Sequence, residues 1–134
     1  MCAKTEPFEL DAAFANEFAV EWIAAWNEHD LAKVLSHYNE EIEFSSPFVI
    51  ARGVDPSGTV RGKQALAGYW GPALTPDSTL HFELKNVLVG VNTLAIVYRT
   101  NAGGQEREAA EVFQFDASGS VYRAFANYSD SLTP

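Results

Sequence analysis

Large hydrophobic side chains in the N-terminal part of the chain recur at helical spacing. Residues 11–28 contain no glycine or proline, and Phe14, Phe18, Trp22 and Trp26 fall on one face of a helix. The acidic residues of this stretch fall on the opposite side. The pattern predicts an amphipathic helix over residues 11–28.

Two shorter helices are predicted after it. Asp30 can cap the next helix with its carboxylate. That helix, over residues 31–38, presents one apolar stripe formed by Leu31, Val34, Leu35 and Tyr38. A third helix is predicted over residues 63–70, where Gly71-Pro72 ends it.

After Pro76 the spacing of apolar residues changes from helical to alternating. Residues 80–85 and 94–99 alternate apolar with polar positions, and two further strand-like runs at residues 106–115 and 121–128 flank a turn. A short strand is predicted at residues 42–46, where a proline stops it. The stretch 48–61 is predicted to be a long loop, a kind of segment that often serves as a binding or lid element.

Helices followed by hairpin-linked strands indicate a single α+β domain over residues 1–134. Three N-terminal helices would pack on one face of a mainly antiparallel sheet. A chain of 134 residues that is 47% hydrophobic is large enough to bury a core and has the composition of a globular protein.

Charge and cysteine content exclude several classes of partner. The formal net charge is −9, and no basic run would bind a phosphate backbone or an anionic membrane surface. The single cysteine, Cys2, cannot form an internal disulfide, and no Cys/His cluster has metal-binding spacing. No signal-peptide or transmembrane stretch is evident. We expect a cytoplasmic protein that uses no metal and no cofactor and binds neither nucleic acid nor membranes.

One carboxylic acid falls on an apolar strand face. By alternation, Glu111 shares a face with Ala109, Phe113 and Phe115. Burial of a carboxylate is costly unless the group is paired or protonated, so Glu111 is a candidate site residue. Two other interpretations remain open: Glu111 lies at a wet rim beyond the helices, or it bonds a tyrosine in a purely structural role.

The order of elements resembles the nuclear transport factor 2-like superfamily. Four local motifs carry the resemblance in the expected order, namely Trp26-Asn27-Glu28-His29-Asp30, the segment from Tyr38 to Phe44, Arg61-Gly62-Lys63-Gln64-Ala65-Leu66, and Phe115-Asp116-Ala117-Ser118-Gly119. Within the superfamily the sequence is most similar to ketosteroid isomerases and SnoaL-like polyketide cyclases. The resemblance implies a strongly curved sheet, a cone with a central pocket for a small apolar molecule, and a homodimer formed through the convex sheet face.

The resemblance also implies roles for individual residues. Glu111 falls where ketosteroid isomerases carry a protonated acid that stabilises an oxyanion, and Tyr38 matches a second-helix tyrosine of the site. Their general base, an aspartate, is replaced here by Ser46, and their first-helix tyrosine by Trp22. Serine cannot remove a proton from carbon without an activating base, so steroid isomerisation by that mechanism is not expected.

The predicted site combines these residues with the inward faces of the strands. Glu111 and Tyr38 are the candidate catalytic residues, and the candidate ligand-binding residues are Trp22, Ser46, Trp70, Phe82, Ile96, Tyr98, Ala109, Ala126 and Tyr128. Ala124 and Ala126 either leave room for a cavity or allow close helix packing.

Three functions remain open at this stage. The pocket could serve acid–base chemistry of the isomerase, dehydratase or cyclase type, with Glu111 as the acid or base. It could bind a ligand without catalysis. The third alternative is an association module that uses the outward residues Val97, Val112 and Phe125. Neither the ligand nor the presence of catalysis follows from the sequence.

Overall fold

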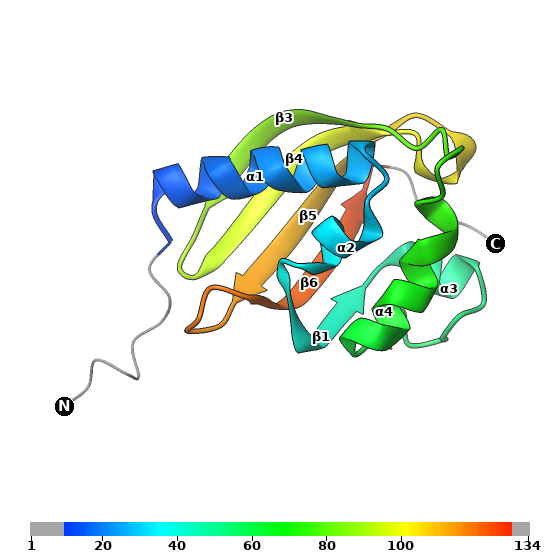
Figure 1. Ribbon diagram of the computed structural model, residues 1–134, viewed down its shortest axis with the longest axis horizontal. Coiled ribbons are helices and arrows are strands. Elements are labelled where there is room, and N and C mark those ends of the chain that lie inside the picture. Colours follow the sequence, from blue (N-terminus) through cyan, green and yellow to red (C-terminus); the bar gives the residue numbers. More distant parts are fainter. Residues whose placement is uncertain (1–9, 130–134) are drawn as a thin grey trace.

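Six strands form one curved sheet, with the order β2-β1-β6-β5-β4-β3, in the computed structural model, which describes residues 10–129 (Figure 1). The strands are β1 Tyr38–Ser45, β2 Thr59–Arg61, β3 Phe82–Val89, β4 Thr93–Thr100, β5 Arg107–Phe115 and β6 Val121–Tyr128. Neighbouring strands are antiparallel except β1 and β6, which pair in parallel. The predicted mainly antiparallel sheet is confirmed.

The helices lie on one side of this sheet. They are α1 Ala12–Asn27, α2 Leu31–Leu35, α3 Pro47–Ala51 and α4 Lys63–Trp70. The long helix α1 crosses in front of β3, β4 and β5, and α3 and α4 lie near β1, toward the end of the sheet at which β2 is the edge strand (Figure 1). The α+β cone architecture is therefore confirmed, with one more helix than predicted.

Side-chain caps explain where the first two helices begin. Asp11 accepts a hydrogen bond from the backbone N–H of Phe14 at 2.8 Å, and Asp30 accepts one from Lys33 at 3.1 Å. Each bond satisfies a backbone donor that has no partner inside the helix. The predicted capping role of Asp30 is confirmed.

The second helix is shorter than predicted, and this changes the place of Tyr38. Helix α2 ends at Leu35, and Tyr38 is the first residue of β1, where it pairs with Val121 of β6. Tyr38 continues the helical spacing of Leu31, Val34 and Leu35 by coincidence. It is a strand residue whose side chain is buried in the same core. Assignment of Tyr38 to the second helix was wrong, because pairing with a distant strand outweighs the local pattern.

The stretch 48–61 is not a continuous loop. Ser46 caps α3 by accepting a hydrogen bond from the Phe48 N–H at 3.1 Å, and Pro47 occupies the first turn, where its missing N–H costs nothing. After a turn, β2 pairs with β1 and places Val60 opposite Phe44. The Ser-Pro pair was a helix-start signal that the sequence prediction treated only as a strand end.

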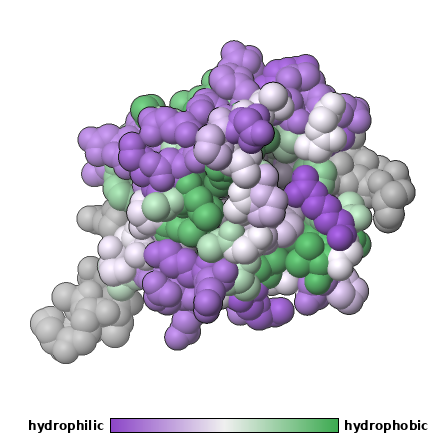
Figure 2. Space-filling model, turned by 45° about the vertical axis from the view of Figure 1, so that its right-hand side comes forward, coloured by the Kyte–Doolittle hydropathy of each residue, from purple (hydrophilic) through white to green (hydrophobic). Residues whose placement is uncertain are grey.

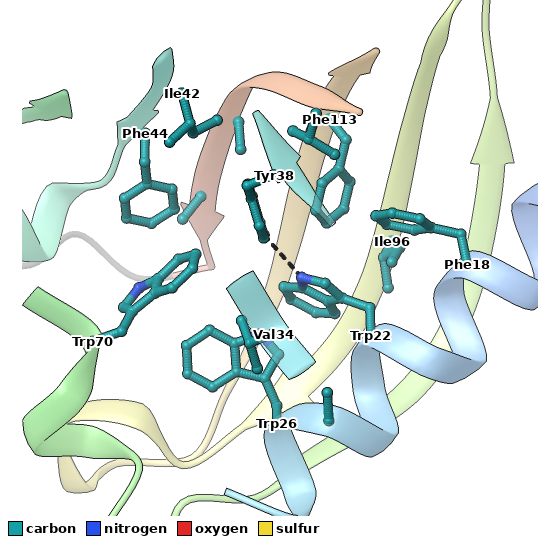
Figure 3. Packing of buried hydrophobic residues seen from close by; sticks show 14 of the residues in the cluster. Phe18, Trp22, Trp26, Val34, Tyr38, Ile42, Phe44, Trp70, Ile96 and Phe113 are labelled. Carbon is teal, nitrogen blue, oxygen red and sulfur yellow. Dashed lines mark hydrogen bonds between the residues drawn. The ribbon is translucent and has the colours of Figure 1, made fainter. Parts of the chain in front are cut away.

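The core between helices and sheet is strongly aromatic. Trp22 and Trp26 project from α1 toward the sheet, and the Trp22 ring meets Tyr98 and Phe113 edge-on, with ring centroids 5.4 and 5.3 Å apart. Figure 3 shows Trp22 and Tyr38 pointing toward one another, and the Trp22 indole N–H donates to the Tyr38 hydroxyl at 3.0 Å.

No helix within residues 10–129 is long and apolar enough to cross a membrane.

Candidate functional site

A cavity of about 390 Å³ lies between the inner face of the sheet and helices α1, α3 and α4. Its volume is in the range of small-molecule sites in proteins. The mouth is bordered by α3, by residues 78–80 before β3, and by the 3₁₀ turn Ala102–Gly104 that joins β4 to β5. In Figure 2, with this end of the molecule turned forward, hydrophobic side chains are visible between hydrophilic ones.

Aromatic rings form a large part of the cavity wall. All three tryptophans of the chain take part, as do the residues Phe44, Phe48, Tyr69, Phe82, Tyr98 and Tyr128. Trp26 meets Trp70 edge-on, with centroids 4.9 Å apart, and stacks on Phe82 at 5.0 Å. Its buried indole N–H has no hydrogen-bond partner among the described residues. Such a wall favours flat, apolar molecules.

Glu111 is the one carboxylic acid among the described residues that line the cavity. It occupies the middle of β5, opposite Ile96 of β4 and Ala126 of β6, and only 3% of its surface is exposed. The Tyr98 hydroxyl donates to its Oε1 at 3.3 Å, a long hydrogen bond. The rim interpretation is therefore wrong. Glu111 does bond a tyrosine, and it also faces the cavity.

Burial raises the pKa of Glu111 to about 8, although the hydrogen bond from Tyr98 acts in the opposite direction. A carboxyl with this pKa is largely protonated at neutral pH, so it can donate a hydrogen bond. Burial also raises the pKa of the phenols of Tyr98 and Tyr38, and the nearby Glu111 carboxylate raises it further. These phenols stay neutral hydrogen-bonding groups.

Ser46 lies beside two further phenols at the α3 side of the cavity. Burial raises the pKa of Tyr69 and Tyr128, and hydrogen bonding with Ser46 acts against that rise in both. Ser46 is itself 5% exposed, and its oxygen already accepts the α3 capping bond. It therefore orients groups and caps a helix, and none of its hydrogen bonds within residues 10–129 joins it to a base that would make it a nucleophile.

The structure brings most of the predicted site residues together. The cavity wall contains Glu111, Trp22, Ser46, Trp70, Phe82, Tyr98 and Tyr128. The other four predicted residues, Tyr38, Ile96, Ala109 and Ala126, are buried but do not line the cavity. Their placement at the cavity wall is corrected accordingly.

The reason for the difference is geometric. Alternation predicts which residues of a strand face inward. Helix α1 packs on the middle of the inner sheet face, so the cavity occupies only one end of that face. Ala124 and Ala126 are fully or almost fully buried, at 0% and 6% exposure, and neither belongs to the cavity wall. The two small side chains therefore serve close packing. The Tyr38 hydroxyl is held by Trp22 inside the core.

Several wall residues were missed by the sequence prediction, among them Phe48, Arg52, Tyr69 and Asn101. Phe48 and Arg52 belong to the α3 segment, where the sequence pattern predicts a loop with a binding role. Asn101 fixes the mouth, because its side chain accepts from the His81 N–H and donates to the Thr79 carbonyl, both at 2.8 Å. An asparagine at the first position of the turn Asn101-Ala102-Gly103-Gly104 is a signal for such a role.

Within the part of the chain that the structure describes, no group of three or more His, Cys, Asp or Glu side chains is placed to hold a metal ion. Glu111 has no second acid next to it in the cavity wall. Glu111, the phenols, Ser46 and Arg52 of the wall can form hydrogen bonds to a ligand, and Glu111 can also transfer a proton.

The family model for the SnoaL-like domain matches residues 19–124. The chain therefore belongs to the SnoaL-like domain family, and the resemblance inferred from its motifs is confirmed. None of the functionally curated proteins compared with it matches the chain.

Solved structures show the same fold. A SnoaL-like protein of unknown function from Burkholderia thailandensis E264 is 45% identical, with a TM-score of 0.82 over 93% of this chain and 100% of that chain. An NTF2-like protein of unknown function from Burkholderia xenovorans LB400 is 16% identical, with a TM-score of 0.67 over 90% of this chain and 86% of that one. SalBIII, an epoxide hydrolase/cyclase-like enzyme in pyran ring formation in the polyether salinomycin, is 16% identical, with a TM-score of 0.68 over 89% and 93%.

Proposed function

We propose that this protein binds a small, oxygen-bearing apolar molecule in the cavity and that Glu111 acts on it as a proton donor. One observation carries the proposal: the single carboxylic acid in the described cavity wall is almost fully buried among aromatic rings, and burial raises its pKa to about 8. Pockets of this kind hold an apolar ligand by shape and orient it with a few polar groups.

A neutral carboxyl in such a site has a defined chemical use. It donates a hydrogen bond to a carbonyl, hydroxyl or ether oxygen, and the bond strengthens as negative charge develops on that oxygen. A pKa near the working pH lets the same group give up a proton and take it back. Isomerisation, dehydration and cyclisation all pass through states in which an oxygen gains or loses a proton.

The residue at the position of the ketosteroid isomerase base limits which reactions the cavity can support. Ser46 replaces the aspartate that ketosteroid isomerases use, so proton removal from carbon by that group is not part of the proposal. A reaction that needs one acid–base group fits this cavity. SalBIII, a cyclase-like enzyme, has the same fold. This similarity supports cyclase-type chemistry as one such reaction.

Replacement of Glu111 by glutamine tests the proposal. Glu111→Gln keeps the size of the side chain but replaces the acidic O–H by an amide N–H, which is a weaker donor and cannot transfer a proton. We therefore expect binding of phenols, terpenoid alcohols or steroid ketones to weaken about tenfold. Titration of a panel of these compounds is read by tryptophan fluorescence, because all three tryptophans line the cavity.

The matched control is Glu108→Gln, which makes the same change at an exposed position of the same strand. It should bind as the wild type does. If the wild type binds nothing in the panel, or if Glu111→Gln and the wild type bind every compound equally well, Glu111 is not the functional group of a ligand site.

We further propose that the protein is a homodimer formed through the outer sheet face. Val112 of β5 lies next to Phe125 of β6 and Ala95 of β4 on this face, and these side chains are only partly buried within one copy of the chain. Leu88, which pairs with Ala95, is 53% exposed. Together they form an apolar strip across β3 to β6 that a second copy could cover.

Light scattering at tens of micromolar should therefore give twice the mass of the chain, and Phe125→Glu should give the mass of one chain. Val20→Glu is the control, because Val20 is a 59% exposed apolar residue on α1, on the other side of the molecule. A monomeric wild type, or a Phe125→Glu variant with unchanged mass, would rule out this interface.

A further inference from the structure

Two guanidinium groups flank one aromatic ring at the cavity mouth. The Arg52 guanidinium lies 4.7 Å from the centre of the Phe48 ring, and that of Arg107 lies 5.8 Å from it. Arg52 and Phe48 both line the cavity. Cation–π contacts of this kind hold a guanidinium in place without neutralising its charge.

These two arginines differ from the other cationic side chains in residues 10–129. Each of the other lysines and arginines described there lies within 4.0 Å of a carboxylate, and the six are Lys33, Arg61, Lys63, Lys85, Arg99 and Arg123. Arg52 and Arg107 have no such acid partner among the described residues. The chain has 18 acidic residues and 9 basic ones. Within residues 10–129, the two cationic side chains that have no acid partner lie on the same aromatic ring.

The surrounding turn fixes this arrangement. Arg107 is only 7% exposed, and it donates from Nη1 to the Ala102 carbonyl at 3.1 Å, which ties it to the Ala102–Gly104 turn. Gly103 of that turn has φ +80°, and a Cβ placed there would lie 2.8 Å from Phe48 Cζ. A side chain at this position would therefore push Phe48 away. The close contact keeps Phe48 beside both guanidinium groups.

The charge of Arg52 also reaches into the cavity. It lowers the pKa of the Tyr69 and Tyr128 phenols, against the larger effect of burial. Because Glu111 is largely protonated at neutral pH, Arg52 is the one charged side chain in the described cavity wall. The cavity is thus locally cationic in a protein whose net charge is −9.

We infer that the ligand of this cavity is an apolar carboxylate, with its carboxylate at Arg52 in the mouth and its apolar part between the tryptophans. The inference rests on the proposed function and specifies its substrate class. A single guanidinium in the wall matches a planar, singly charged carboxylate, which it can bind through two parallel hydrogen bonds. The buried Arg107 adds positive potential behind Phe48.

Matched pairs of acids and amides test the assignment. We expect naphthylacetate and cinnamate to bind the wild type about tenfold more tightly than naphthylacetamide and cinnamamide, because the amides keep the shape and lose the charge. In Arg52→Gln this preference should disappear while amide binding is kept. Arg52→Lys should restore part of it, and Arg99→Gln, which removes an exposed arginine paired with Glu106, should leave it unchanged. Arg52 is exposed, so added salt should reduce the preference.

The outcomes separate this inference from the proposed function. If acids and amides bind the wild type equally well, or if Arg52→Gln keeps the preference for acids, the anion site is refuted and the apolar pocket stands. If the wild type binds neither acids, amides nor the neutral panel, both are refuted. These probes carry one polar group, so the acid-to-amide ratio should be unchanged in Glu111→Gln if that group lies at Arg52. A preference that disappears in Glu111→Gln but not in Arg52→Gln would place the carboxylate at Glu111 and refute the anion site.

Discussion

The wild-type protein should lose stability as the pH rises from about 4.5 to 8, and Glu111→Gln should remove that loss. The pKa of Glu111 is raised from the ordinary value of 4.5 to about 8 in the folded protein, because burial disfavours its charged form. Between these two pH values the folded state holds a proton on Glu111 that the unfolded state has released. Each pH unit in this interval therefore lowers the free energy of unfolding by about 1.4 kcal/mol through this one group.

The sign of the effect is the reverse of that for an ordinary salt-bridged carboxylate. The stabilising contribution of the protonated Glu111 is fully present below pH 4.5 and is lost as the pH rises toward 8. His37 acts in the opposite direction, because burial lowers the pKa of its imidazole and the protein gains stability as that group loses its proton. The difference between wild type and variant at each pH isolates the contribution of Glu111.

Urea unfolding at a series of pH values from 4.5 to 9 measures this difference. The free energy of unfolding of Glu111→Gln should exceed that of the wild type by an amount that grows with pH and then levels off above about 8. Glu108→Gln should follow the wild type throughout. A constant difference between Glu111→Gln and the wild type across the whole range would show that Glu111 titrates normally.

Loss of the buried bond between Trp22 and Tyr38 should give the second large effect. Trp22 and Tyr38 are buried, with 1% and 2% of their surface exposed. Trp22→Phe removes ring volume and leaves the Tyr38 hydroxyl without its hydrogen-bond donor. We expect the free energy of unfolding to fall by about 3 kcal/mol, from an unsatisfied buried oxygen together with a small cavity. Tyr38→Phe leaves the indole N–H unpaired and should cost about 1–3 kcal/mol.

A double-mutant cycle separates the bond from the change in volume. The double variant should be destabilised by less than the sum of the single ones, because both remove the same hydrogen bond. Trp70→Phe, the same change of size at another buried tryptophan, serves as the control for volume. Strict additivity in the cycle would mean that the bond contributes nothing. Ligand binding should be kept in Tyr38→Phe, since Tyr38 lies outside the cavity wall.

Local signals in the sequence were sufficient for most of the fold. The cap at Asp30, the glycine that ends α4 and the alternation over β5 act over a few residues, so the pattern alone locates these elements. The start of β1 was misplaced because it depends on pairing with β6, more than 80 positions later in the chain, at Val121. The α3 segment was missed because its five residues are too few for a periodic pattern.

The candidate site was predictable only in part, for a related reason. Alternation correctly placed Glu111 on the inner face, because that face is fixed by every second residue of one strand. Which part of the inner face stays open depends on how far α1 extends over the sheet, and that is a tertiary property. Ile96 and Ala126 were therefore assigned to the cavity although they flank Glu111 in the packed core. Arg52 was missed because its environment is created by the α3 turn and by Arg107, 55 positions away.

The ionisation of Glu111 inside the folded protein decides whether this carboxyl can donate a proton at neutral pH. Carbon-13 NMR of the side-chain carboxyl, assigned with Glu111→Gln, follows its titration without reference to any ligand. We predict a midpoint of about 8 and a shift of that midpoint when an oxygen-bearing apolar molecule occupies the cavity. A midpoint near 4.5 would contradict the proposed function, because the carboxyl would then be ionised at neutral pH and unable to donate a proton.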